Sequence, residues 1–216
     1  MNGSRGLRFT LFGFPVQVDI MFLIIVAILG SGAGDAAKVV IWVAVVFVSV
    51  LAHELGHAFM GRSFGLSAAI RLYGMGGMTH WLNERDTTPS QDILISLSGP
   101  CTGLAIGAAV FGLRTVLPPP QGELMREFVW ILLWVNIGWA ILNLLPIIPL
   151  DGGHVMRSVL HIVLGHPNET IPRVISVVFA VSALGLALLV EMYWAAMLAG
   201  MFAVMNIAAL AGSRET

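Results

Sequence analysis

Two histidines and a glutamate with the spacing of a metal site lie within an apolar stretch of the sequence. His53 and His57 are four positions apart in the segment VLAHELGHAFMG, so on a helix both imidazoles project from the same face. That arrangement suits two corners of a tetrahedral zinc site, and Glu54 lies beside them, in position to take a proton from metal-bound water. The pattern predicts a zinc ion held by His53 and His57, with Glu54 as the general base.

The location of this motif in an apolar stretch is stronger evidence for a metal site than the motif itself. The motif HExxH occurs by chance in many proteins, whereas two histidines and a glutamate inside an apolar helix are costly in lipid and are usually retained for function. The alternative is a polar cluster that only holds helices together. The location within an apolar stretch favours the metal site.

A catalytic zinc usually has three protein ligands and one open position for water, so a third ligand must come from another part of the chain. The segment NLLPIIPLDGGH, residues 143–154, has Asp151 as its only carboxylate. The expected topology brings this segment to the membrane depth of the two histidines. Asp151 is therefore the favoured third ligand. His154 is the alternative, with Asp151 then acting as its hydrogen-bonding partner.

The same segment is expected to be irregular. Pro146 and Pro149 cannot lie in an unbroken helix, so the chain must kink or unwind just before Asp151. Irregular backbone at membrane depth is tolerated only where it is buried in protein or lines a water-filled cavity. The amide of Asn143 either hydrogen-bonds the substrate backbone or an oxyanion, or it bonds a neighbouring helix. For Asn136, two turns earlier, we expect the helix–helix bond.

Composition places the chain in a bilayer. Hydrophobic residues make up 57% of the 216 residues and charged residues only 11%, against roughly 25% charged residues in an average soluble domain. A soluble fold of this size would lack the polar residues to cover its surface, so the sequence predicts a polytopic membrane protein. The formal net charge of −1 gives no indication of nucleic-acid binding. The single cysteine, Cys101, excludes an internal disulfide.

We expect an all-α polytopic membrane protein of about six transmembrane helices, forming one domain over residues 1–216. Each span needs about 20 mostly apolar residues. The first apolar stretch follows two arginines, as in a secretory signal, but because further apolar stretches follow, we interpret it as a retained helix. The expected spans are Val18–Gly34, Val39–Met60, Ile93–Leu117, Phe128–Ile148, Val174–Val190 and Trp194–Ala211.

Positive charges set the expected orientation. Of the 11 Lys and Arg residues, eight lie on the side of the N-terminus and three on the opposite side. By the positive-inside rule, both termini are expected in the cytoplasm and the chain in the inner (cytoplasmic) membrane. The second and fourth spans then run in the same direction, so that their cytoplasmic ends, which carry the histidines and Asp151, are level.

The longest polar connection, Gly65–Pro89, separates the second and third spans. Within it, Ala69–Trp81 (AIRLYGMGGMTHW) has Gly74, Gly76 and Gly77 between two short mixed stretches. This pattern is typical of a β-hairpin or a small sheet, here at the membrane surface. An irregular cytoplasmic loop is the open alternative.

The HELGH motif in a membrane helix, followed later in the chain by NLLPIIPLDGG, resembles the site-2 protease family of intramembrane metalloproteases. Ser98-Gly99-Pro100 resembles a further segment of that family. The asparagine that commonly follows this segment in relatives is absent here, where the sequence is Cys101-Thr102-Gly103. The resemblance covers the second to fourth spans.

This resemblance implies a fold, a metal and a reaction. It implies a three-helix catalytic core with additional helices, a membrane-associated β-hairpin at the glycine-rich segment, and one Zn²⁺ bound by His53, His57 and Asp151 with Glu54 as general base. Many bacterial members carry a PDZ domain or a pair of CBS domains. Neither is visible in this sequence, so we expect a minimal member or a truncated chain.

The implied activity is metal-assisted hydrolysis of a peptide bond in a transmembrane segment that unwinds locally. Expected partners are the lipid bilayer, a regulatory membrane protein, and single-pass membrane substrates such as membrane-tethered anti-sigma factors or transcription factors. The hairpin at Gly76 and Gly77 would bind the unwound segment by β-strand addition.

Two other classes of function remain open on the sequence. A metal transporter would use the same histidines and aspartate as a transit site, but it would place polar residues along a whole pathway, and here they cluster at one depth. A catalytically silent relative would bind membrane proteins without cutting them. The intact Glu54 argues against this second class, because an inactive protein does not need the base.

Overall fold

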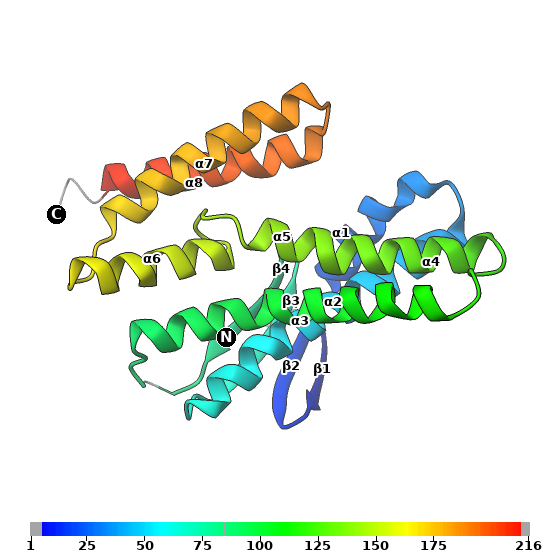
Figure 1. The fold of residues 1–216 in the computed structure, drawn as a ribbon, viewed down its shortest axis with the longest axis horizontal. Helices are drawn as coiled ribbons and strands as arrows, with labels where there is room; N and C mark the ends of the chain where they lie inside the picture. Colours follow the sequence, from blue (N-terminus) through cyan, green and yellow to red (C-terminus); the bar gives the residue numbers. More distant parts are fainter. Residues whose placement is uncertain (1–5, 84, 213–216) are drawn as a thin grey trace. The chain divides into compact units, whose positions relative to one another are not determined.

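The computed structural model describes residues 6–83 and 85–212, mostly as helices with one small sheet (Figure 1). The chain divides into two compact units. The first comprises Met1–Asp86 and Ser98–Ile141, and the second comprises Thr87–Leu97 and Leu142–Thr216. Helix α3, Pro89–Val116, contributes residues to both units.

A four-stranded sheet forms the strand part of the first unit. Its strands are β1 Gly6–Leu11, β2 Phe14–Asp19, β3 Ala68–Tyr73 and β4 Gly76–Trp81. They follow the order β1-β2-β3-β4, with antiparallel pairs at both edges and a parallel pair between β2 and β3. The β3–β4 pair confirms the hairpin predicted within Ala69–Trp81. The N-terminal hairpin β1–β2 is not among the predicted elements.

Alternate residues of β3 form the buried face of the sheet: Ala68, Ile70 and Leu72. Ile70 pairs with Thr79 of β4, and Leu72 pairs with Gly77. Directly paired residues of antiparallel strands point to the same side of a sheet. Thr79 and Gly77 therefore lie on the buried face of the sheet.

Two helices of the first unit pack on this face: α1, Ile20–Gly30, and α2, Ala36–Ser63. Helix α2 begins after Asp35, whose side chain accepts a hydrogen bond from the amide of Ala37 and so satisfies one of the free amides of the first turn. Burial of apolar side chains between the sheet and these helices fixes the sheet against α2. The buried cluster consists of Phe14, Val16, Val18, Phe22, Val26, Val50, Leu51, Ala58, Ala68, Ile70 and Leu72.

The structure differs from the sequence prediction at the first span. The segment predicted as Val18–Gly34 contains the end of β2, the 11 residues of α1 and a 3₁₀ turn at Ser31–Ala33. At 1.5 Å per residue, α1 is roughly 16 Å long, about half of the ~30 Å hydrocarbon core of a bilayer. The apolar residues of the strand run directly into those of the helix, so hydropathy alone does not separate the two.

A continuous helical run follows α3 and corresponds to the fourth predicted span. It consists of α4 Glu123–Leu133, the π-helical segment η2 Trp134–Gly138 and α5 Trp139–Asn143. Within η2, the amide nitrogen of Asn136 donates a hydrogen bond to the hydroxyl of Ser49 on α2, at 2.9 Å. This bond confirms the helix–helix contact predicted for Asn136.

The second unit contains α6 Asp151–Leu164, α7 Thr170–Leu189 and α8 Tyr193–Gly212. Helices α7 and α8 lie side by side as an antiparallel pair (Figure 1). They correspond to the fifth and sixth predicted spans, whereas α6 is not among the predicted elements.

Five helices within residues 6–83 and 85–212 are long and apolar enough to cross a bilayer. Their bounds lie within a few residues of five of the six predicted spans, which is consistent with a multi-pass membrane protein. These helices are Ala36–Ser63, Pro89–Val116, Glu123–Asn143, Thr170–Leu189 and Tyr193–Gly212.

Residues 144–150 form no helix, which confirms the predicted break before Asp151. Side chains from two helices of the second unit satisfy the backbone of this segment. The amide of Ile148 donates to Oγ of Ser176 on α7 at 3.0 Å, and Nδ2 of Asn206 on α8 donates to the carbonyl of Ile148 at 2.7 Å. Both side chains are buried. Protein groups therefore replace the helical hydrogen bonds that this segment lacks, as is required of irregular backbone within a membrane.

Candidate metal and catalytic site

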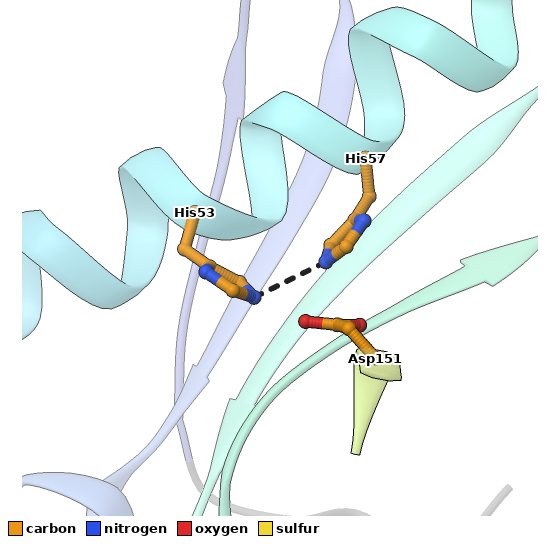
Figure 2. Close-up of side chains that lie close together, drawn as sticks. All are labelled: His53, His57 and Asp151. Carbon is orange, nitrogen blue, oxygen red and sulfur yellow. Dashed lines mark hydrogen bonds between the residues drawn. The ribbon is translucent and has the colours of Figure 1, made fainter. Parts of the chain in front are cut away.

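The two histidines of the HELGH motif lie on one face of α2, as their spacing predicts. Their Nε2 atoms are 3.1 Å apart, and their ring centroids are 4.8 Å apart with an angle of 78° between the ring planes. Figure 2 shows both rings extending from the helix, with a dashed line between the two nitrogens, and also draws Asp151 of the second unit. The helix therefore presents two imidazole nitrogens to a single small volume.

The spacing of these nitrogens matches that of two ligands of one metal ion. Two nitrogens that each lie about 2.0–2.1 Å from a tetrahedral zinc are roughly 3.3 Å apart. The observed separation of the Nε2 atoms of His53 and His57, 3.1 Å, is close to that distance. Imidazole nitrogen is a ligand suited to zinc, copper, iron and nickel. The histidine pair thus fits a transition-metal ion.

Helix α3 approaches the histidine pair at Gly99. A Cβ atom added to Gly99 would collide with Nε2 of His57 and would lie 2.7 Å from Nε2 of His53. On α2 itself, a Cβ on Gly56 would lie 2.7 Å from the carbonyl oxygen of Ser98. Small residues therefore let the two helices come close together, and Gly99 leaves room for both rings. This gives a physical reason for glycine within the Ser98-Gly99-Pro100 segment.

We expect Gly99→Ala to weaken metal binding about tenfold or more, equivalent to about 1.4 kcal/mol, because the added methyl group would displace both rings. Gly112→Ala is a matched control on the same helix, since nothing lies within 4 Å of the Cβ added there. The measurement is competition for zinc between the purified protein and a chelating dye. Equal zinc affinity in Gly99→Ala and the wild type would contradict the close approach.

Glu54 points to the sheet rather than to α3. Adjacent residues of a helix are about 100° apart around its axis, so Glu54 and His53 project in different directions. The Glu54 side chain is buried, and its Oε2 accepts a hydrogen bond of 2.8 Å from the hydroxyl of Thr79 on β4. A buried carboxylate needs such a partner, because burial of an unpaired charge is costly.

Gly76 and Gly77, the predicted substrate-binding glycines, have different surroundings in the first unit. Gly76 begins β4 with φ +127°, a conformation that side-chain-bearing residues rarely adopt, and nothing lies within 4 Å of a Cβ added there. A Cβ on Gly77 would collide with Oε1 of Glu54 and lie 2.8 Å from its carboxyl carbon. Gly77 thus makes room for the predicted general base, a role that the sequence does not suggest.

Asp151 and Asn143, the other predicted site residues, belong to the second unit. Asp151 is the half-buried first residue of α6, and Asn143 is the last residue of α5. A Cβ on Gly153 would lie 2.5 Å from the carbonyl carbon of Ile147. Glycine at this position therefore lets the irregular segment fold back tightly against the start of α6, and this packing fixes the backbone that carries Asp151.

His154, the alternative third ligand, lies one turn further along α6. Its Nδ1 is 3.5 Å from Nη2 of Arg157. Another nitrogen of that guanidinium is 3.7 Å from a carboxylate oxygen of Glu169. A positive charge beside an imidazole disfavours a second cation on the same ring. We therefore expect His154 to be a poorer metal ligand than Asp151.

Two residues that contact the site were not predicted to do so. Thr79 lies in the predicted hairpin, but the sequence gives no sign that its hydroxyl reaches Glu54, because 25 residues separate them. Gly99 belongs to the Ser98-Gly99-Pro100 segment, whose resemblance to the site-2 protease family does not indicate that this glycine contacts the two histidines. Both contacts depend on how distant segments pack.

The chain is similar in sequence to one peptidase family and to several curated proteins. The model of peptidase family M50 matches residues 41–121 and 119–190, which is more than half of the chain. Two curated relatives carry zinc metalloprotease in their names. The protein sll0528 of Synechocystis sp. is 29% identical over 178 residues, covering 75% of this chain and 46% of the relative. Rip3 of Mycobacterium tuberculosis is 32% identical over 164 residues, covering 68% and 42%.

A solved structure shares the fold. The site-2 protease from Methanocaldococcus jannaschii superposes with a TM-score of 0.65 at 23% sequence identity, covering 95% of each chain. By contrast, this chain spans a little less than half the length of the two curated relatives.

Proposed function

The chain belongs to peptidase family M50, and from this premise we propose that it is an intramembrane zinc metalloendopeptidase that cuts transmembrane segments of membrane proteins. The membership confirms the resemblance to the site-2 proteases drawn from the HELGH and NLLPIIPLDGG motifs. The observation that carries the proposal is the pair of Nε2 atoms 3.1 Å apart on α2, next to a buried and hydrogen-bonded glutamate.

His53, His57 and Asp151 are the proposed ligands of one zinc ion. The spacing of the two histidine nitrogens supports the first two ligands. For the third, support comes from the position of Asp151 at the start of α6, directly after a segment whose backbone is held by buried side chains. When bound, zinc would acidify a water molecule and polarise the scissile carbonyl group.

Glu54 is the proposed general base. Its carboxylate would accept a proton from the attacking water and later deliver that proton to the leaving amine. Asn143 is the proposed donor of a hydrogen bond to the substrate backbone or to the developing oxyanion. In this proposal the two histidines and Asp151 bind the metal, and Glu54 transfers the proton.

Strand β4 is the proposed docking site for the substrate. It lies at one edge of the sheet that the structure describes, and an edge strand can pair with an added extended segment. A transmembrane substrate must unwind before hydrolysis, since a helix shields its carbonyl groups. Pairing with β4 would hold the unwound segment extended, close to the strand residues that contact Glu54.

We expect Gly76→Val to lower cleavage about tenfold while zinc stays bound. Valine has open space at this position but is strained at φ +127°, so the start of β4 would shift and its pairing edge would be distorted. Cleavage rate and zinc content of the purified variant are the two measurements. Normal cleavage by Gly76→Val would remove the support for substrate pairing at this strand.

The proposed location is the inner membrane, with both termini in the cytoplasm. The excess of Lys and Arg on the side of the termini supports this orientation, and reporter fusions at the two ends would measure it. Proposed substrates are membrane-tethered regulators such as anti-sigma factors or transcription factors, with a regulatory membrane protein as a further partner.

The test of the proposed function is cleavage of a panel of tagged single-span proteins by the purified protein in liposomes, with and without a zinc chelator. Cleavage that the chelator abolishes and added zinc restores is the expected result. A zinc-loaded protein that leaves a broad panel intact would contradict the proposal.

A further inference from the structure

The carboxylate of Glu54 is held by two residues of β4, and the first of them is Thr79. The Thr79 hydroxyl lies 2.8 Å from Oε2 of Glu54 and 3.1 Å from the main-chain oxygen of the same residue. A hydroxyl has one hydrogen to donate. The bond to the carboxylate is the shorter of the two. The hydroxyl is therefore assigned to Oε2.

The second residue is Gly77, which lies against the other oxygen of the same carboxylate. A Cβ on Gly77 would collide with Oε1 of Glu54 and would lie 2.6 Å from its Cγ. The Glu54 side chain thus fits between the Thr79 hydroxyl and the bare backbone of Gly77. Because Glu54 is only 6% exposed, the carboxylate has little space in which to adopt other rotamers.

The register of the sheet determines the position along α2 at which Thr79 and Gly77 contact Glu54. Thr79 is paired with Ile70 and Gly77 with Leu72, and both β3 residues are almost fully buried in the cluster between the sheet and α2. A shift of the β3–β4 register by one residue would turn both contacts away from Glu54. The register of a small sheet therefore determines where the carboxylate lies.

We propose that Thr79 is a positioning residue for Glu54: its hydroxyl holds Oε2 and so fixes the orientation in which the carboxylate accepts a proton during hydrolysis. The inference rests on the proposed function of Glu54 as general base. Correct placement of a proton acceptor matters because a displacement of about 1 Å costs on the order of 10²-fold in rate. Without this hydrogen bond, the Glu54 carboxylate would also populate rotamers that are not oriented to accept the proton.

The decisive comparison is Thr79→Val against Thr79→Ser. Valine keeps the branched shape suited to a strand but has no hydroxyl, and serine keeps the hydroxyl. We expect Thr79→Val to lower kcat about 10- to 100-fold with KM and zinc content unchanged, and Thr79→Ser to retain most of the wild-type kcat. The matched control is Thr10→Val on β1, at the opposite edge of the sheet, which should cleave like the wild type.

A second readout does not depend on cleavage. In zinc-free protein labelled with ¹³C at the glutamate carboxyl carbons, the signal of Glu54 is identified by its loss in Glu54→Gln among the seven glutamates of the chain. We expect this signal to move in Thr79→Val and to return towards its wild-type position in Thr79→Ser. A signal that is the same in Thr79→Val and the wild type would overturn the hydrogen bond itself.

The outcomes separate this inference from the proposed function. If the wild type cleaves and Thr79→Val cleaves at the same rate, the positioning role is wrong and the protease stands. If Thr79→Ser fails as badly as Thr79→Val, the hydroxyl is not what matters, and the positioning role is again wrong. If the zinc-loaded wild type cleaves nothing, the proposed function fails and the role of Thr79 in hydrolysis fails with it.

Discussion

Replacing Glu54 with glutamine should lower peptide-bond cleavage about 10²- to 10⁴-fold, the usual contribution of a positioned general acid–base, while zinc remains bound. Glutamine has nearly the same size, so it fits against Gly77, and its amide oxygen can still accept the hydrogen bond from Thr79. An amide nevertheless cannot take a proton from water at neutral pH. The measurement is the initial rate of cleavage of tagged single-span substrates, together with zinc content.

Glu54→Gln is a sharper test than Glu54→Ala. Alanine would leave the Thr79 hydroxyl without its carboxylate acceptor and would open a void beside Gly77, so a loss of activity could reflect local rearrangement. Equal cleavage by the wild type and Glu54→Gln would point to a contaminating protease and leave the general-base assignment without support. Zinc binding without cleavage by either protein would favour a transporter or a silent membrane-protein binder.

The second large effect is expected on metal content. His57→Ala should lower zinc affinity about 100-fold or more, equivalent to about 2.7 kcal/mol, because one of two nitrogens that share a single small volume is removed. Cleavage should then disappear at zinc concentrations that saturate the wild type. Zinc content after dialysis and zinc affinity by dye competition are the measurements. A full equivalent of zinc retained by His57→Ala would show that the metal is bound elsewhere.

The same measurement decides between the two candidates for the third ligand. Asp151→Asn should lose zinc, because a neutral amide is a poor substitute for a carboxylate ligand. His154→Ala should keep its zinc, since the nearby guanidinium of Arg157 already disfavours a cation on that ring. The reverse pattern, with zinc lost in His154→Ala and kept in Asp151→Asn, would replace Asp151 by His154 in the site.

Much of the fold follows from patterns that a short window of sequence contains. Of the six spans predicted from the apolar stretches, five correspond to helices of spanning length with similar bounds, and the glycines between two mixed stretches favour the hairpin observed as β3–β4. The prolines before Asp151 gave the break in the helix. Each of these predictions needs only local properties, namely hydropathy over one span or backbone angles over a few residues.

The N-terminal hairpin shows where this local reasoning fails. Apolar residues alternate along β1 and β2, and the turn between them contains Gly13 with φ +87°, so a strand signal is present in the sequence. The apolar run that continues into α1 obscured it. Helix α6, also absent from the predicted elements, has 14 residues and is therefore shorter than the roughly 20 apolar residues of a membrane span.

The sequence by itself determined which residues carry the chemistry: His53 and His57 share a face because the helical period requires it, whatever surrounds the helix. Only the tertiary structure decided what holds that chemistry in place. Thr79 reaches Glu54 across 25 residues of sequence, and Gly99 reaches the histidines from another helix. Such contacts depend on strand register and on the packing of a sheet and a helix against α2. These are properties of the whole fold, which no local spacing specifies.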